Sequence, residues 1–228
     1  SDKAVNPTSV MGASKRVCEM LVQQLDRRSA TEFVTVRFGN VLGSSGSVLP
    51  LFQEQIAAGG PVTVTDPNVT RYFMTIPEAC QLIMQSVAIG AREAVYTLDM
   101  GEPVPIRLLA EQMIRLAGKQ PERDIAIVYT GLRPGEKLHE TLFHADERYR
   151  PTVHPKILQA EARSVSAEKL QPALARMREA VAAFDTEELA RLLRETLPEF
   201  RPGNADTEAE REDTGTVVAF PARQARKT

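Results

Sequence analysis

Apolar residues recur at helical spacing near the start of the chain. Spacings of three and four residues place side chains on one face of a helix, so the pattern predicts a helix over residues 10–28. Thr8 and Ser9 precede it and are residue types that cap free backbone N–H groups at a helix start. The apolar positions of this predicted helix are Val10, Cys18, Leu21, Val22 and Leu25.

The rest of the chain alternates between amphipathic stretches and short β-rich runs. Where β-branched and aromatic residues concentrate, strands are predicted over residues 31–38, 62–65, 95–98 and 125–129. Helices are predicted over residues 51–58, 77–89, 106–117, 168–184 and 186–197. The loop GLRPGEKLHETLF is expected to lead into one more helix. Strands that alternate with helices indicate an α/β fold.

The composition is that of an ordinary globular protein. The 228 residues are 43% hydrophobic and 25% charged, enough to build one sizeable core. A net charge of −2 gives no support for binding to nucleic acid or to an anionic membrane surface. No apolar run approaches the roughly 18 residues that span a bilayer, so no transmembrane segment is predicted. Cys18 and Cys80 lack metal-binding spacing, and we expect two reduced, buried thiols and no metal site.

The composition changes towards the C-terminal end. From Pro202 the residues become acidic and polar and then basic, which predicts a disordered tail over residues 202–228. Residues 161–201 contain the last two predicted helices and are expected to form a helical C-terminal extension.

A dinucleotide-binding loop is not found. A doubly wound domain binds its cofactor at a glycine-rich turn between its first strand and helix. The run GNVLGSSG follows a predicted strand, but its glycines lack the Gly-x-Gly-x-x-Gly spacing and Pro50 comes soon after. The chain also starts at Ser1 without a Met. We therefore expect a part of a longer protein, without the half that holds the cofactor.

The opening stretch SDKAVNPTSVMGASK carries the most concentrated chemistry. Ser1, Asp2 and Lys3 supply a hydroxyl, an acid and an amine side by side. Met11 and Lys15 are four residues apart and should share one face of the predicted helix. An arbitrary Asp-Lys pair is usually a solvated turn, so its weight comes from the surrounding sequence.

This stretch resembles the catalytic segment of extended short-chain dehydrogenase/reductases, in which Tyr-x-x-x-Lys opens a helix. Here Met11 stands at the tyrosine position. The string SDKAVNPTSVMGASKR is similar to the nucleotide-sugar 4,6-dehydratases of the polysaccharide-biosynthesis (capsule-type) family, whose membrane-anchored branch also has methionine there. Further segments resemble that family: VRFGNVLGSSGSVLPLFQEQIAAGGPVTVTDPNVTRYFMTIPEA, LDMGEPVPI and GLRPGEKLHETLF. The resemblance runs from Ser1 to about Lys156 and is loose beyond it.

The resemblance implies an α/β fold: the C-terminal part of an extended short-chain dehydrogenase/reductase Rossmann-like domain plus a small α/β substrate-binding subdomain. The N-terminal βαβ units that bind the cofactor would be missing. Residues 1–160 would form the catalytic and substrate-binding part. The implied cofactor is NAD and the implied substrate is a UDP-sugar, expected to be UDP-N-acetylglucosamine. A cytoplasmic location is expected, and the intact parent is expected to be a homo-oligomer, with a long form anchored in the bacterial inner membrane.

The resemblance also implies catalytic roles. In this family NAD oxidises C4 of the sugar, the C5 proton is removed, water leaves from C6 and hydride returns to C6. Asp2 would be the acid for water loss, Lys3 the base at C5, and Ser1 a hydrogen-bond partner near the C4 oxygen. Lys15 would hold the nicotinamide ribose. Met11 cannot take a proton, and we expect Asp2 to deprotonate the C4 hydroxyl instead. A lysine base must be partly neutral, so Lys3 needs burial or a cationic neighbour such as Lys15.

Substrate binding is expected from two arginines. Arg71 and Arg133 would bind the pyrophosphate, because the guanidinium fork fits phosphate oxygens bidentately. Glu136 would accept from ribose hydroxyls. The alternative is that Arg71 and Glu136 only pair within their own loops. The other substrate-binding residues implied are Asn40, Gly46, Ser47, Val48 and Thr65. Besides Lys15, the cofactor-binding residues implied are Phe38, Asn40 and Val41.

Two other functions remain open on the sequence. A nucleotide-sugar 4- or 5-epimerase shares the oxidation step and differs in where the hydride returns, although an acid next to an amine favours dehydration. From a different class, the chain is a non-catalytic nucleotide-sugar-binding fragment, which the missing glycine-rich unit favours. Product analysis distinguishes the dehydratase from the epimerase, and titration with NAD and UDP tests the binding fragment.

Overall fold

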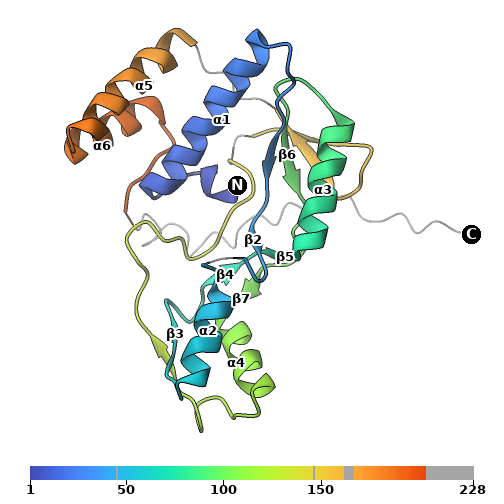
Figure 1. Ribbon diagram of the computed structural model, residues 1–228, viewed down its shortest axis with the longest axis vertical. Helices are drawn as coiled ribbons and strands as arrows, with labels where there is room; N and C mark the ends of the chain where they lie inside the picture. The colour runs from blue at the N-terminus through green and yellow to red at the C-terminus, as the bar shows by residue number, and fades with distance from the viewer. Residues whose placement is uncertain (45, 146, 162–166, 204–228) are drawn as a thin grey trace, which may run out of the picture.

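The computed structural model describes residues 1–44, 46–145, 147–161 and 167–203. A four-stranded sheet occupies the middle of the molecule, a pair of helices lies at one end, and a smaller α/β body forms the other end (Figure 1). The helices are η1 (Asp2–Ala4, a 3-10 turn), α1 (Val10–Arg28), α2 (Val48–Ala57), α3 (Ile76–Ile89), α4 (Ile106–Leu116), α5 (Ala167–Ala182) and α6 (Thr186–Thr196).

The four-stranded sheet has the order β1-β6-β10-β9. Its strands are β1 (Thr35–Arg37), β6 (Val95–Leu98), β9 (Tyr149–Pro151) and β10 (Ile157–Ala160). β1 pairs with β6 in parallel, while β10 is antiparallel to both β6 and β9. All four residues of β6 are buried, and the core on this sheet includes side chains of α3. This explains why β6 has a continuous run of β-favouring residues.

The smaller body contains α2, α4 and three two-stranded sheets (Figure 1). The strand pairs are β2 (Asn40–Val41) with β5 (Phe73–Met74), β3 (Val62–Val64) with β8 (Ile127–Tyr129), and β4 (Thr70–Arg71) with β7 (Val104–Pro105). Its own core gathers apolar side chains from β3, α2, α4 and β8. This body therefore has a core of its own, while Val41 of β2 and Met74 of β5 pack with the central sheet.

The helices α5 and α6 pack together beside α1 (Figure 1). Leu170, Met177 and Leu192 are buried against Val17 and Met20 of α1. After α6 the chain returns to the start of the molecule, where the Arg201 N–H donates to the Pro7 carbonyl over 3.0 Å. The predicted helical extension is therefore part of the core.

The structure corrects four expectations. The first strand is shorter than predicted, because the N–H of Phe33 donates to the Asp26 carboxylate. Residues 131–145 and 147–161 contain no helix, so the helix expected after GLRPGEKLHETLF is wrong. The strands β9 and β10 were not predicted, and both cysteines are exposed.

Residues 204–228, the greater part of the predicted tail, lie outside the described residues. Among those described, no helix combines the length and the apolar character needed to cross a membrane.

Candidate functional site

The segment Ser1–Ala4 lies between β1 and α1, with Asp2 and Ala4 buried and Ser1 and Lys3 partly buried. The Asp2 N–H donates to the carbonyl of Phe38, just past β1, over 3.2 Å, and Asp2 is 2% exposed. The Ser1 hydroxyl accepts from the Lys3 N–H and caps the 3-10 turn. Gly12 allows α1 to pack closely on this turn, because a Cβ there would lie 2.6 Å from the Lys3 carbonyl oxygen. Local capping and close packing thus hold the acid and the amine inside the protein.

The Lys3 amine is surrounded by three acceptors. Its Nζ lies 3.0 and 3.1 Å from the two carboxylate oxygens of Asp2 and 3.0 Å from Oε1 of Glu140. Asn40 Oδ1 accepts from the same nitrogen over 3.4 Å. An ammonium has three N–H donors, whereas a neutral amine has only two and a lone pair. The arrangement therefore matches a protonated Lys3.

The electrostatics agree with that assignment. Burial raises the pKa of Asp2, and the nearby charge of Glu140 raises it further, against the opposing effect of Lys3. Burial by itself lowers the pKa of Lys3, but the charges and hydrogen bonds of Glu140 and Asp2 outweigh burial, so the net pKa is raised. A lysine base must be partly neutral, as expected above for Lys3, whereas the structure favours its charged form.

Arg71 of β4 belongs to the same group of charges. Its Nη2 lies 3.0 Å from Glu136 Oε1, and its Nε lies 3.7 Å from the Glu140 oxygen that also accepts from Lys3. The backbone carbonyls of Thr70 and Leu138 accept from its Nη1 over 2.7 and 3.2 Å. Arg71 of β4 therefore pairs with Glu136 of the loop after β8, whereas the alternative reading of the sequence had each residue pair only within its own loop.

Other predicted residues lie around this group. Thr65 donates its hydroxyl to Glu136 Oε1 over 3.0 Å, so it joins the same network. Gly46 precedes Ser47 and Val48 at the start of α2, a helix that has no side-chain hydrogen bond at its N-cap. Arg133 points largely into solvent, with its side chain 80% exposed and its Nε 3.5 Å from Glu136.

The predicted cofactor residues are less closely grouped. Met11 is 57% exposed and Lys15 is exposed on the surface of α1. Lys15 forms no hydrogen bond or ion pair with the residues that the structure describes. Phe38 and Val41 are half-buried and pack against the core of the central sheet. The structure thus joins Asp2, Lys3 and Arg71, while Met11 and Lys15 stay outside that group.

The sequence analysis missed Glu140, which belongs to this group, and Lys137, which lies against the opening segment. Lys137 is buried, and its Nζ donates to the carbonyl of Val5 over 2.7 Å. Both residues lie in GLRPGEKLHETLF, the segment for which a helix was wrongly predicted. The sequence signal that could have indicated them is an acid and a lysine within a segment that resembles one of the family's segments.

A second group of buried charges supports the site from behind. Arg37 of β1 is 1% exposed and pairs with Glu19 of α1 at 2.8 Å and with Glu147 at 2.8 Å. Arg16 links Glu19 to Glu199, which follows α6. Because Arg37 directly precedes Phe38, this chain of ion pairs ties the end of β1 to α1 and to the C-terminal extension.

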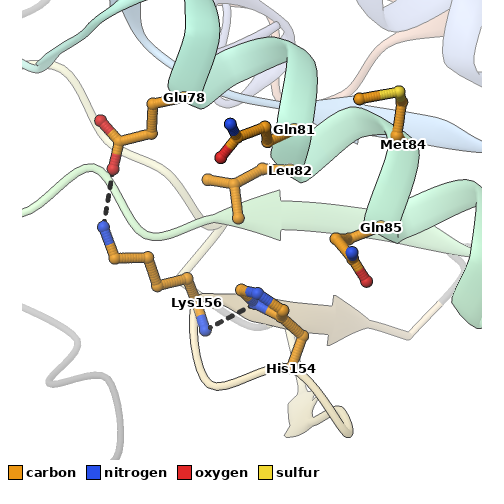
Figure 2. A pocket seen from close by; sticks show the side chains of 7 residues that line it. All are labelled: Glu78, Gln81, Leu82, Met84, Gln85, His154 and Lys156. Carbon is orange, nitrogen blue, oxygen red and sulfur yellow. Dashed lines mark hydrogen bonds and ion pairs between the residues drawn. The ribbon is translucent and has the colours of Figure 1, made fainter.

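A hollow of about 370 Å³ lies elsewhere, between α3 and the turn that leads into β10 (Figure 2). Lys156 reaches across it to Glu78, with its Nζ 2.6 Å from the carboxylate. No residue predicted for catalysis or substrate binding lines it; the lining residues are Glu78, Gln81, Leu82, Met84, Gln85, His154 and Lys156. We assign no function to this hollow.

Comparison with known proteins identifies relatives of this arrangement. A sequence profile described as "Polysaccharide biosynthesis protein" matches residues 1–162. The capsular polysaccharide biosynthesis protein CapD of Staphylococcus aureus is 57% identical over 158 residues, which are 69% of this chain and 26% of that protein. The chain therefore spans about a quarter of the length of that curated relative.

Solved structures agree with the α/β fold. Pen from Bacillus thuringiensis superposes with a TM-score of 0.62 at 30% identity, over 76% of this chain and 59% of that one. DesIV, a dTDP-glucose 4,6-dehydratase from Streptomyces venezuelae with NAD and TYD bound, superposes with a TM-score of 0.52 at 20% identity, over 60% and 43% of the two chains. The second likeness is evidence of fold alone. The expected short-chain dehydrogenase/reductase fold is confirmed.

Proposed function

The chain belongs to the polysaccharide biosynthesis protein family, and on that premise we propose that it is the catalytic and substrate-binding part of a nucleotide-sugar 4,6-dehydratase. The proposed substrate is a UDP-sugar such as UDP-N-acetylglucosamine, and the product is a 4-keto-6-deoxy sugar. One observation carries the proposal: Lys3 touches Asp2 and Glu140 in a buried site that continues to Arg71. Proton transfer on a phosphate-bearing substrate needs that combination of groups.

Asp2 and Lys3 account for the protons of the reaction. Asp2 takes the proton of the C4 hydroxyl and later gives it to the C6 hydroxyl, which leaves as water. Lys3, once neutral, takes the proton from C5 and returns it to that carbon. The raised pKa of Asp2 suits a group that must be protonated when water leaves. The raised pKa of Lys3 means that it must first lose its own proton to solvent, while Asp2 stays ionised to accept the C4 hydroxyl proton.

Arg71 is the proposed anchor for the pyrophosphate. It is 9% exposed, and its position is held by backbone carbonyls as well as by carboxylates. The uncapped start of α2 at Ser47 offers backbone N–H groups and the positive end of a helix dipole to the same anion. Arg133 is exposed and free to turn towards a phosphate, and Glu136 has acceptor capacity for a ribose hydroxyl.

One feature of the described residues fits NAD. The exposed ammonium of Lys15 is available to hydrogen-bond ribose hydroxyls, as the resemblance implies. Phe38, Asn40 and Val41 remain predicted cofactor contacts. When bound, NAD would supply the oxidation at C4 and the hydride that returns at C6.

Calorimetric titration of the chain with UDP tests the binding part of the proposal. Arg71→Gln should weaken UDP binding about tenfold or more, since a charge-assisted hydrogen bond is worth about 1.5–3 kcal/mol. Arg107→Gln is the matched control, because Arg107 lies exposed on α4 and pairs with Glu111 of the same helix. Equal affinity in the two variants would remove Arg71 from the site, and no UDP binding by the unmodified chain would refute the proposal.

Mass spectrometry tests the reaction. UDP-N-acetylglucosamine and NAD are incubated with a chain extended to include a cofactor-binding part. Dehydration lowers the mass of the sugar by one water, whereas epimerisation leaves it unchanged. Asp2→Asn should abolish water loss, because an amide cannot donate the required proton. Product of unchanged mass would favour the epimerase, and UDP binding without turnover would favour the binding fragment.

A further inference from the structure

Glu140 is a buried carboxylate that connects two parts of the candidate site. Its Oε1 lies 3.0 Å from Lys3 Nζ and 3.7 Å from Arg71 Nε. Its side chain is only 5% exposed. Its second oxygen, Oε2, is buried and has no hydrogen-bond partner among the described residues. A carboxylate oxygen buried in this way is costly, so folding alone is a poor explanation for an acid at this position.

We infer that Glu140 is a positioning residue for the proposed proton transfer: it fixes the Lys3 amine against Asp2 and retains a proton on that pair. The inference rests on the proposed function. The three N–H donors of the Lys3 ammonium face three acceptor residues, namely Asp2, Asn40 and Glu140. Without it, one N–H of Lys3 loses its acceptor and the amine loses its fixed direction.

The charges that face the pair come from several segments. The amino group of Ser1 and the two members of the pair belong to the start of the chain, Arg71 comes from β4, and Glu140 comes from the loop after β8. Glu136 lies in that same loop but contacts Arg71, and no ion pair with Lys3 is formed. Glu140 is therefore the acidic group from outside the pair that lies closest to the Lys3 amine.

This placement has a consequence for the pH at which the pair works. Two groups this close titrate together and hold a single proton only between their two apparent pKa values. That single-proton state is required when water leaves, because Asp2 must then be protonated while Lys3 is neutral. The negative charge of Glu140 raises the pKa of both groups, whereas burial raises the pKa of Asp2 and lowers that of Lys3. Glu140→Gln should therefore move the single-proton window to lower pH.

Nuclear magnetic resonance of the full chain tests the inference without any need for catalysis. Lysine labelled with ¹⁵N and aspartate labelled with ¹³C report the pKa of Lys3 and of Asp2 directly. In Glu140→Gln both values should fall, and Glu140→Asp should restore them in part. Glu136→Gln is the matched control, from the same loop and with the same partner Arg71, and it should change both values less.

The inference is overturned if Glu140→Gln leaves both pKa values unchanged, or if Glu136→Gln lowers them equally. An amide spectrum with native dispersion shows that each variant is folded. If Glu140→Gln fails to fold, Glu140→Asp decides, because a shorter carboxylate should loosen the contact and lower the pKa of Lys3 part of the way. A chain that shows these shifts yet fails to bind UDP would refute the proposed function and leave the contact of Glu140 with the pair standing.

Discussion

Glu19→Gln tests the buried ion pairs behind the site. Glu19 accepts from Arg37 Nε and Nη2 over 2.8 and 2.9 Å and from Arg16 Nη1 over 3.1 Å. The side chains of Glu19, Arg37 and Arg16 are 5%, 1% and 3% exposed. Glutamine keeps the shape but loses the charge, and its amide N–H groups face guanidinium groups that cannot accept a hydrogen bond. The substitution therefore leaves buried positive charge without a full partner.

The expected cost follows from these contacts. Breaking a buried ion pair from one side costs about 3–5 kcal/mol. Arg37 keeps Glu147 and Arg16 keeps Glu199, so the lower end applies. We expect the free energy of unfolding to fall by about 3 kcal/mol, which would move a urea midpoint by about 1 M or more.

The effect should depend on pH. Burial by itself raises the pKa of Glu19, but the hydrogen bonds and charge of Arg37, with the charge of Arg16, outweigh it and lower the pKa below the usual 4.5. A lowered pKa contributes stability above pH 4.5 that is lost as the pH falls through the folded-state value. The difference in free energy of unfolding between Glu19→Gln and the unmodified protein should thus be largest at neutral pH and become smaller in acid.

Urea unfolding followed by circular dichroism at neutral and acidic pH measures both effects. Glu188→Gln on α6 is the control, since Glu188 pairs with Arg176 and Arg191 on the surface, and it should shift the midpoint far less. A neutral-pH shift no larger than that of the control would refute the reasoning, as would a difference that does not change with pH.

Two further predictions concern packing. Gly135→Ala should cost about 1–3 kcal/mol, because φ is +77° and a Cβ would lie 2.8 Å from the Thr8 carbonyl oxygen. Gly131→Ala, at φ +83° with nothing nearby, should cost less in the same urea assay, and an equal loss would exclude the contact with Thr8. Leu170→Ala should cost about 2–5 kcal/mol because its side chain is fully buried where α5 meets α1, whereas Leu116→Ala, at an 86% exposed position, should leave the thermal midpoint nearly unchanged. A small loss at Leu170 would show that the extension docks only weakly.

Most helices could be predicted because their signals are local. The helix predicted over residues 10–28 is α1, with the same bounds, and Ser9 caps it through a 3.1 Å bond from the Gly12 N–H. The run at residues 95–98 is β6, again with the predicted bounds. Strands β9 and β10 escaped prediction because they are short, and because β10 depends on the distant strand β6 and β9 depends in turn on β10. Pairing of that kind leaves little trace in local sequence.

The candidate site divides in the same way. The sequence by itself predicted Asp2, Lys3 and Arg71 as site residues, because a short string of residue types similar to a known family can be recognised without coordinates. Only the tertiary structure brought Glu140 to the Lys3 amine and decided which protonation state that amine favours. Charge state depends on burial and on distances between groups, and here residues 3, 71 and 140 are separated by long stretches of chain. The electrostatic interaction among these three residues arises only when the chain folds, so no local sequence pattern predicts its strength.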